Sequence, residues 1–383
     1  MSRPEKMLVV GGGIAGMTTA TALAQLGFRV TLLESAPEFG EIGAGLTLTP
    51  NAMRGLDFIG ICEAAAAVGV EPARQRFQHW QDGRTLVAID RSGQREKYGA
   101  PYITVHRADV HDVMTQAARR AGVEMIAGAN VISSTGTMVT TADGRSFSGD
   151  CLIGADGVKS VIRERFETAP PQFSGHVAWR CLVPVTPDIQ HLSDFPGIII
   201  GPGAMIARYN VRESTIMNLA FFSRQQGWSG EGWTTPADPD EVRRTYADWC
   251  EDTQLLIEAA CQHPMFKWAI NIRKPLPTWV LDGNVTLIGD AAHAMTPFLG
   301  QGAVTGIEDA VVLARALAAS ATIAEGLTRY EKARYERATF IQQESNANAE
   351  RMQGQDTDLF GMEDMKDEES LGLFHYDPRT VAV

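Results

Sequence analysis

Short apolar runs alternate with helical patterns at the start of the chain, and this order is typical of an α/β fold. Residues 7–10 form the first apolar run and predict a buried strand. Apolar residues then recur at helical spacing from Met17 to Leu26, and Gly27 is a typical helix end. Residues 28–33 predict a second strand. The pattern therefore indicates a strand–helix–strand unit near the N-terminus.

Two later apolar runs predict strands that each end in a carboxylate. Residues 151–155 run into Asp156, and residues 285–288 run into Gly289-Asp290. After a loop, residues 300–302 open another helical pattern. Small residues let backbone N–H groups approach a ligand, and the N-terminus of a helix attracts negative charge. The second of these segments therefore predicts an anion-binding strand–loop–helix.

The middle of the chain has strand-like patterning. Residues 177–180 and 198–211 predict strands, and the Gly-Pro-Gly at 201–203 predicts a bulge or a turn. Because side chains alternate along a strand, one face should carry Met205, Ala207 and Tyr209. Arg208 should point the other way, as a solvated or paired surface residue. The pattern predicts a second, β-rich region.

The C-terminal half combines helical patterns with polar segments. Residues 228–237 have the composition of a loop, and Asp238 then resembles an N-cap of a helix that should reach about Cys250. Residues 327–352 predict a long charged helix, whose polar side we expect to be solvated. The acidic residues 363–370 predict a flexible connector.

Composition narrows the class of protein. The 383 residues are 44% apolar and 21% charged, which is ordinary for a soluble globular protein. A formal net charge of −12 argues against nucleic acid or an anionic membrane as a partner. The first residues lead almost directly into a strand, so we expect no signal peptide. Five dispersed cysteines and histidines without metal-ligand spacing favour a cytoplasmic protein without a metal site.

The first strand–helix–strand unit carries a dinucleotide-binding motif. Gly11, Gly13 and Gly16 form G-x-G-x-x-G, in which the glycines make a tight turn, admit a pyrophosphate and let helix and strand pack closely. Glu34 follows Gly16 by 18 residues, where a carboxylate can accept both ribose hydroxyls. FAD and NAD both have that unphosphorylated ribose, so this motif alone does not separate them.

Six motifs together resemble the single-component FAD-dependent aromatic hydroxylases, which include the 4-hydroxybenzoate, salicylate, 3-hydroxybenzoate and 6-hydroxynicotinate monooxygenases. The resemblance covers nearly the whole chain. The motifs are GGGIAG (11–16), GAGLTLTPNAMRGL (43–56), HRADVHDVM (106–114), ADGVKSVIR (155–163), HVAWRCLVPV (176–185) and GDAAHAMTPFLGQG (289–302). The tail FHYDP (374–378) resembles the endings of the salicylate and hydroxynicotinate branch.

The resemblance implies a 4-hydroxybenzoate hydroxylase-like fold, in which a β-sheet substrate domain is inserted into a Rossmann-like FAD-binding domain. We expect the FAD-binding domain to take residues 1–73, 100–175 and 277–345. The substrate domain would take residues 74–99 and 176–276, and residues 346–383 would form the end of the last helix and a tail. The fold class is therefore expected to be α/β with a separate β-rich part.

The resemblance also implies the cofactor and its contacts. FAD would be reduced by NADH or NADPH and would react with O2 to a flavin C4a-hydroperoxide, which hydroxylates an aromatic ring. A second G-x-G-x-x-G for the nicotinamide is absent from the sequence, which fits transient binding. The residues expected to contact FAD are Gly11, Gly13, Ile14, Ala15, Gly16, Glu34, Arg107, Asp156, Asp290, Gly300, Gln301, Gly302 and Ala303.

The substrate site is where this chain departs from the family. Several relatives have a histidine proposed as the base at the position of Met205, and the hydroxynicotinate branch has one at Thr47, so 6-hydroxynicotinate is put in doubt. The expected catalytic residues are Tyr209, Pro297 and His293. The expected substrate contacts are Thr47, Arg180, Met205, Tyr209 and Pro297.

A structural role is the alternative to a functional one for several of these residues. Tyr209 suits a substrate hydrogen bond or a core position equally. Arg180 suits a carboxylate anchor or an ion pair. His293 fits loop orientation better than proton transfer.

Three functions are compatible with these motifs. The first is hydroxylation of a phenolic or N-heteroaromatic acid by a monomer or homodimer that uses O2 and NAD(P)H. The second is the same chemistry on a larger substrate such as a quinolone, a polyketide or an antibiotic, and the methionine at 205 favours it somewhat. The third, which Pro297 and the Gly300 loop disfavour, is a non-catalytic FAD-binding or redox-sensing protein.

Overall fold

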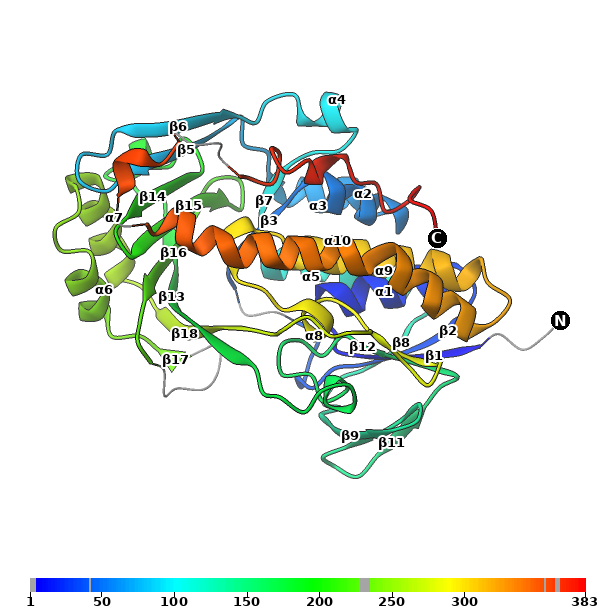
Figure 1. The fold of residues 1–383 in the computed structure, drawn as a ribbon. Helices are drawn as coiled ribbons and strands as arrows, with labels where there is room; N and C mark the ends of the chain where they lie inside the picture. Colours follow the sequence, from blue (N-terminus) through cyan, green and yellow to red (C-terminus); the bar gives the residue numbers. More distant parts are fainter. Residues whose placement is uncertain (1–4, 41–42, 228–234, 355, 362–365) are drawn as a thin grey trace.

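The computed structural model describes residues 5–40, 43–227, 235–354, 356–361 and 366–383. Figure 1 shows two halves side by side: a sheet beneath a layer of long helices, and a larger sheet with two helices on its outer face. The longest helix crosses from one half to the other. The predicted α/β class, with a separate β-rich part, is confirmed.

The first half is built on a six-stranded sheet with the order β19-β20-β12-β1-β2-β8. All its neighbours are parallel except β19 and β20. Its strands are β1 (Lys6–Val10), β2 (Arg29–Leu33), β8 (Glu124–Ile126), β12 (Cys151–Gly154), β19 (Val280–Leu281) and β20 (Val285–Leu287). Four of them were predicted to within one residue, because parallel strands that are buried on both faces are continuous apolar runs.

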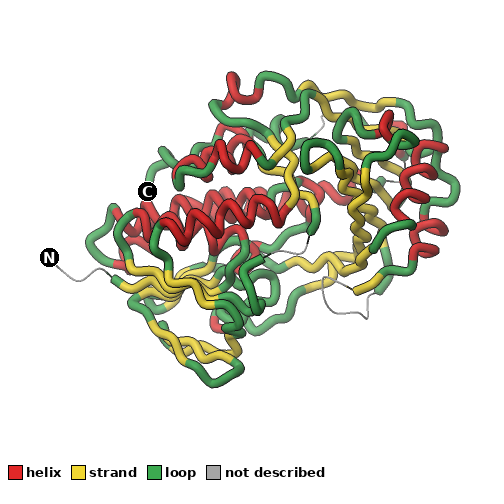
Figure 2. Tube along the Cα trace, turned by 180° about the vertical axis from the view of Figure 1, so that it is seen from behind, coloured by secondary structure: helices red, strands yellow, loops and turns green. Residues whose placement is uncertain are grey.

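Helices cover one face of this sheet and a small antiparallel sheet lies beyond the other (Figure 2). The covering helices are α1 (Ile14–Gln25), α5 (Arg107–Arg120), α9 (Gly302–Ala318) and α10 (Ile323–Met352). The small sheet contains β9 (Val131–Thr135), β10 (Met138–Thr141) and β11 (Ser146–Ser148). Side chains between helices and sheet form the largest apolar core of the described residues.

The second half is built on an eight-stranded sheet with the order β17-β18-β13-β16-β15-β14-β5-β6. Its pairs are antiparallel except β14 with β5. Its strands are β5 (Arg74–His79), β6 (Thr85–Asp90), β13 (Gln172–Pro184), β14 (Gly197–Gly201), β15 (Ala204–Val211), β16 (Ile216–Arg224), β17 (Thr235–Pro236) and β18 (Met265–Ile272). The predicted Gly-Pro-Gly feature is the turn from β14 to β15.

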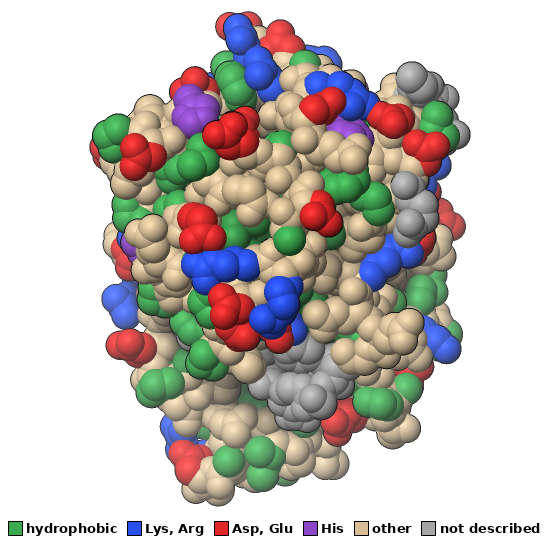
Figure 3. Space-filling view, turned by 90° about the vertical axis from the view of Figure 1, so that its left-hand side faces the viewer, with side chains coloured by type: hydrophobic (Ala, Val, Ile, Leu, Met, Phe, Trp, Pro, Cys, Tyr) green, Lys and Arg blue, Asp and Glu red, His purple; other side chains and the backbone are tan. Residues whose placement is uncertain are grey.

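The helices α6 (Pro239–Thr245) and α7 (Glu251–Cys261) pack on the outer face of this sheet. On that side of the molecule, acidic and basic side chains are interspersed (Figure 3). An exposed example is the pair of Arg243 with Glu258, at 2.8 Å. The inner face of the sheet looks toward the first half and carries a separate apolar cluster.

Several short elements join the halves. A three-stranded sheet contains β3 (Gly45–Leu48), β4 (Gly69–Val70) and β7 (Ile103–His106). The short helices are α2 (Pro50–Phe58), α3 (Cys62–Ala67), α4 (Gln94–Tyr98) and α8 (Asp290–His293). Single 3-10 turns occur at Arg163–Arg165, Gln190–Leu192, Pro297–Leu299, Thr357–Leu359 and Leu373–His375.

Two predictions around residues 228–250 need correction. The helix capped by Asp238, which accepts a hydrogen bond from the Asp240 N–H, ends at Thr245 and not at Cys250. The chain turns there because Tyr246 is fully buried and its hydroxyl donates to the Phe222 carbonyl at 2.9 Å. Tertiary burial therefore overrides the local helical pattern. Residues 235–236 of the predicted loop form β17, and residues 228–234 lie outside the described residues.

The acidic run and the last long helix also differ from expectation. Within residues 366–370, Asp367, Glu368 and Glu369 surround the buried Arg91 at 2.9–3.4 Å, so this part is fixed by ion pairs and is no flexible connector. Residues 362–365 of the run lie outside the described part of the chain. The polar side of α10 is not simply solvated, because Arg334, Gln342, Ser345 and Asn348 are buried and hydrogen-bonded.

The two sheets take their strands from alternating parts of the chain. The six-stranded sheet uses strands between residues 6 and 287, and the eight-stranded sheet uses residues 74–90 and 172–272. The exact domain boundaries stay a prediction. Among the described helices, none is long and apolar enough to cross a bilayer.

Candidate active site

The glycine-rich loop between β1 and α1 has no room for side chains. Gly11 has a φ of +105°, and a Cβ there would overlap the Ala155 carbonyl. A Cβ on Gly16 would overlap the Gly11 carbonyl. Helix α1 begins at Ile14 with Gly13 as its N-cap, and neither a side-chain cap nor an acidic residue occupies its first turn. The N–H groups of this turn are therefore available to a phosphate.

Glu34 lies against this loop, at the end of β2. Its Oε2 accepts a hydrogen bond from the Gly12 N–H at 2.7 Å, and its Oε1 accepts one from the Ala36 N–H at 2.8 Å. On the other side, the buried His111 on α5 contacts the Gly12 carbonyl through Nε2 at 2.7 Å. His111 has no sequence signal for this role, because its contact depends on how α5 packs. The loop and the carboxylate are thus held in the arrangement that a dinucleotide requires.

Asp156, at the end of β12, is occupied by its own turn. Its Oδ1 accepts from the Ser160 hydroxyl at 2.5 Å, and its Oδ2 accepts from the Val161 N–H at 2.8 Å. Burial raises the pKa of this carboxyl, against the effect of these hydrogen bonds. The contacts show a turn-forming role, and the expected contact with the flavin side stays a prediction.

Asp290 and Arg107 each begin a helix that follows a strand. Gly289 ends the loop after β20 with a φ of +56°, and Asp290 begins α8 with an exposed side chain. Arg107 begins α5 directly after β7. Enclosure by the surrounding chain raises the pKa of Asp290, and the charges of His293 and Arg107 oppose that rise. The positive charge of Arg107 therefore acts on the Asp290 carboxylate.

The loop before α9 contains a buried amide without a partner. Gln301 is fully buried, and neither its Oε1 nor its Nε2 has a hydrogen-bond partner among the described residues. Gly300 has a φ of +66°, Gly302 begins α9, and no side chain caps that helix. Unpartnered buried amides are costly, so this one indicates a missing polar ligand. Together with the glycine loop, these residues fit FAD.

Small side chains form a floor on the inner face of the eight-stranded sheet. Ala207 of β15 lies directly opposite Ala220 of β16, and Ala220 lies opposite Arg180 of β13. Directly opposed residues share a face of the sheet. The row therefore has two small side chains next to one another and the charged Arg180 beside them.

The next row along the strands is polar. Tyr209 lies opposite Asn218, whose Oδ1 accepts from the Gly45 N–H at 2.7 Å. A Cβ on Gly45 would overlap the Tyr209 ring, so glycine is required there. Thr47, two residues further along β3, is hydrogen-bonded to Tyr102. Burial raises the pKa of Tyr209 to about 12, although Arg180 opposes this.

Arg180 is the cation of this floor. Its guanidinium carbon lies 4.7 Å from the centre of the Trp268 ring, and its buried Nε has no partner among the described residues. Within the same part of the chain, no carboxylate is within ion-pair distance of it. Burial lowers the pKa of Arg180, and Tyr209 opposes this effect. The predicted alternative of an ion pair therefore finds no support among the described residues.

The row on the other side of the floor is apolar. Met205, 3% exposed, lies opposite Phe222, and both pack in the cluster that contains Phe298. The Phe222 and Phe298 rings are 5.4 Å apart. Pro297, next to Phe298, begins a 3-10 turn above this row. The floor thus separates a polar end from an apolar end.

Two predicted residues lie away from this floor. Arg208 is 3% exposed and donates from Nη2 to the Gln78 side chain at 2.7 Å, so the surface role expected for it is wrong. It is buried because α6 and α7 cover the outer face of the sheet. Burial lowers its pKa to about 10. His293 is also buried, and its Nε2 lies 2.6 Å from Asp309 Oδ2.

The structure thus brings Arg180, Tyr209 and Thr47 to one end of the floor and Met205 and Pro297 to the other. Sequence reasoning missed Asn218, Trp268 and Tyr102. These three residues come from strands, or from the residue before one, that pair antiparallel, and their neighbours depend on a register that the patterns do not reveal.

Known proteins resemble this chain over most of its length. A family model described as FAD binding domain matches residues 5–345. The chain is 37% identical to 3-hydroxybenzoate 6-hydroxylase of Polaromonas naphthalenivorans (81% of this chain, 78% of that protein). It is 33% identical to aurachin C monooxygenase/isomerase of Stigmatella aurantiaca (87% and 85%). A salicylate hydroxylase–substrate complex superposes with a TM-score of 0.84 at 26% identity (99% and 97%).

Proposed function

This chain belongs to the FAD-binding family of aromatic-ring monooxygenases, and on that premise we propose that its substrate is a phenolic or N-heteroaromatic carboxylic acid. The observation that carries the proposal is Arg180. A guanidinium that faces a small-residue floor without a carboxylate partner matches the planar charge of an aromatic acid. Trp268 beneath it holds the guanidinium in place.

The expected FAD contacts become proposals about individual groups. The N-terminus of α1, with Gly11, Gly13, Ile14, Ala15 and Gly16, would hold the pyrophosphate, and Glu34 the adenosine ribose. Arg107 and Asp290 would contact the middle of the cofactor. The segment Gly300–Ala303 and the amide of Gln301 would meet the flavin ring. When bound and reduced by NADH or NADPH, FAD supplies the activation of O2.

The protein's own residues would orient the ring and exclude water. Tyr209 keeps its proton because burial raises its pKa to about 12, so it would donate a hydrogen bond to a phenolate or carboxylate oxygen. Pro297 and Met205 would cover the ring, and Thr47 would support the polar end through Tyr102. The contacts of His293 support an orienting role and not proton transfer to substrate.

A panel of aromatic compounds tests the proposal. Hydroxylated acids, their amides and the corresponding phenols without a carboxylate would be compared by stimulated NADH or NADPH oxidation and by mass spectrometry of products. We expect acids to give hydroxylated product and their neutral analogues to give little. Equal turnover of acids and neutral analogues would contradict the role of Arg180.

A larger apolar substrate is the second candidate. It is favoured by the apolar end of the floor, where Met205 and Phe222 offer no polar group, and by the likeness to an aurachin C monooxygenase/isomerase. A quinolone in the same panel would show which class is preferred. Product from the quinolone, with none from any acid, would establish this alternative.

We also propose a cytoplasmic location, which the cysteines support, and action as a monomer or homodimer. All five cysteines are free, as expected for reduced thiols. Light scattering of the purified holoenzyme measures its mass, and a mass above that of a dimer would contradict the second proposal.

A further inference from the structure

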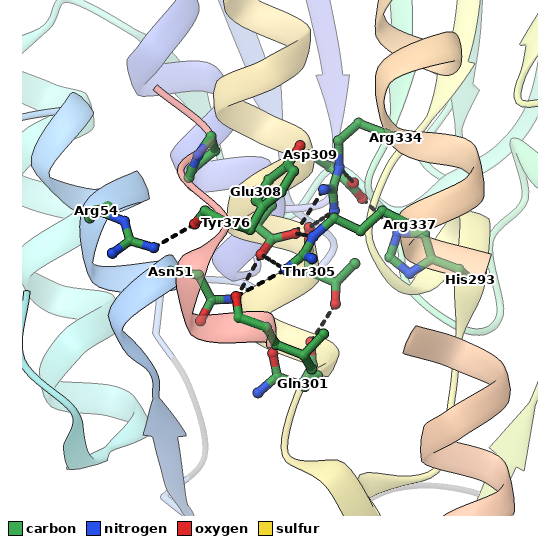
Figure 4. Close-up of polar contacts among 12 residues, drawn as sticks. Asn51, Arg54, His293, Gln301, Thr305, Glu308, Asp309, Arg334, Arg337 and Tyr376 are labelled. Carbon is green, nitrogen blue, oxygen red and sulfur yellow. Dashed lines mark hydrogen bonds and ion pairs between the residues drawn. The ribbon is translucent and has the colours of Figure 1, made fainter. Parts of the chain in front are cut away.

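Figure 4 shows a buried ion cluster close to His293. Arg334 of α10 donates from Nε to Asp309 Oδ1 at 2.8 Å and pairs through Nη1 with Glu308 Oε2 at 2.7 Å. Arg337 contacts both oxygens of Glu308, at 2.8 and 2.9 Å. The side chains of Glu308, Asp309 and Arg334 have no exposed surface. Two carboxylates and two guanidiniums thus balance their charges in the core.

Asp309 differs from the rest of the cluster because its second oxygen holds the turn. Asp309 Oδ2 accepts from the Gly289 N–H at 3.0 Å and lies 2.6 Å from His293 Nε2. Gly289 is the N-cap of α8 and His293 is its last residue, so the two residues bracket Asp290. A side chain at Gly289 would be crowded, since a Cβ there would lie 3.0 Å from Ala15 of the glycine-loop helix. One carboxylate oxygen thus fixes both ends of the segment.

The pKa of Asp309 is consistent with these contacts. Burial raises the pKa of Asp309, but His293, Arg334 and the hydrogen bonds more than offset it and hold the pKa at about 2. The Nδ1 of His293 is buried and has no partner among the described residues. Among the described contacts, the imidazole therefore reaches Asp309 through Nε2 and not through Nδ1.

Glu308 provides an internal comparison. It is the preceding residue of the same helix, is equally buried and shares Arg334 with Asp309. Its other contacts are with Arg337 and with Asn51 of α2, at 2.7 Å, on the side away from Gly289. Any effect that comes only from a lost buried charge should therefore appear at both residues.

We propose that Asp309 is a positioning residue for FAD, which sets the direction of Asp290 by fixing Gly289 and His293. This inference rests on the proposed contact of Asp290 with FAD. Asp309 itself does not touch the cofactor in this scheme. Charge-assisted hydrogen bonds suit the task, because they are shorter and stronger than neutral ones.

The test compares FAD affinity of Asp309→Asn with that of Glu308→Gln. Apoprotein of each variant would be titrated with FAD by flavin fluorescence, and thermal unfolding would be measured without FAD. We expect both variants to unfold at a lower temperature than the wild type. Asp309→Asn should raise the Kd for FAD about tenfold, equivalent to about 1.4 kcal/mol, and Glu308→Gln should raise it less than about threefold. Equal losses of affinity, or no loss in Asp309→Asn, would overturn the proposal.

A second pair of variants keeps the proposal testable if Asp309→Asn does not fold. His293→Gln retains an N–H that can reach Asp309, and His293→Leu does not. We expect the glutamine variant to bind FAD within about threefold of the wild type and the leucine variant about tenfold more weakly. Equal affinities of the two would contradict the inference. A wild type that binds FAD but hydroxylates no acid would refute only the proposed substrate, and one that binds no FAD would refute both.

Discussion

Under the proposed function, Arg180 is the residue on which substrate choice most directly depends. Replacing it by methionine removes the bidentate partner of a carboxylate, which is worth about 2–3 kcal/mol for a charged hydrogen bond. We expect Arg180→Met to raise the KM for an aromatic acid roughly 30- to 150-fold, and Arg180→Lys to raise it less. Steady-state kinetics with an acid and its neutral analogue measure this, and the neutral analogue should be unaffected.

Arg208 offers the matched control, since it is also a buried arginine of the same sheet but lies on the outer face. Arg208→Met should lower the unfolding temperature and leave the KM for the acid unchanged. A similar rise in KM in both variants would mean that the sheet as a whole, and not the guanidinium of Arg180, supports binding.

Tyr209 makes a prediction about pH. Burial raises its pKa to about 12, and the neutral form is favoured at every pH below that value. The pH profile of kcat/KM between about pH 6 and 10 should therefore contain no ionisation of Tyr209. We expect Tyr209→Phe to lower kcat/KM about tenfold through a lost hydrogen bond. The acidic and basic limbs of its pH profile should stay at the same pH values as in the wild type. A limb that disappears in this variant would show that Tyr209 titrates.

Between elements, Asp309 links the stability of the α9–α10 pair to acid. Its pKa of about 2 lies below the ordinary value of 3.8, so the native state favours the ionised form. This contribution, about 2 kcal/mol, is fully present above roughly pH 4 and is lost as the pH falls toward 2. Urea unfolding between pH 5 and 2.5 should therefore show a weaker pH dependence in Asp309→Asn than in the wild type.

The exposed pair of Glu325 with Arg329 is the control for that measurement. Because surface ion pairs contribute little, Glu325→Gln should reproduce the wild-type acid dependence. If Asp309→Asn and the wild type lose stability in parallel, another carboxylate is responsible for the acid sensitivity.

The C-terminal tail is packed against the rest of the protein through Phe374. Phe374 is fully buried between Tyr98 and Tyr102, and Arg54 donates to the Tyr376 carbonyl at 2.7 Å. Phe374→Ala should lower the free energy of unfolding by about 3 kcal/mol or more, as measured by urea denaturation. Leu359→Ala, at a site 52% exposed, should change it little. Equal effects would mean that the tail is not packed as described.

At the level of elements, sequence patterns predicted what local forces decide. Four strands of the first half were found because each is a continuous apolar run, and the glycine loop because its spacing is set by close backbone contact. The end of α6 was misjudged because Tyr246 turns inward to reach a carbonyl of β16. The buried polar side of α10 was missed because its partners come from distant loops.

At the scale of the whole molecule, the helix α10 joins the two halves. Tyr330 near its start donates to the Leu287 carbonyl at 3.1 Å, and Asn348 near its end donates to the Phe298 carbonyl at 2.7 Å. Met352 then packs with Phe77 of the eight-stranded sheet. The sequence predicted this helix but not its contacts. These contacts depend on how two sheets, whose strands alternate along the chain, are placed relative to one another.

The paired alanines of the floor have an evolutionary consequence. Ala207 and Ala220 lie opposite one another on central strands, while the proposed cofactor contacts come from loops of the other sheet. One codon change at either alanine, to valine, would add two methyl groups to the floor and leave the glycine loop and the ion cluster untouched. Under the proposed function, we expect such single steps to change the ring size that is accepted while FAD binding is kept.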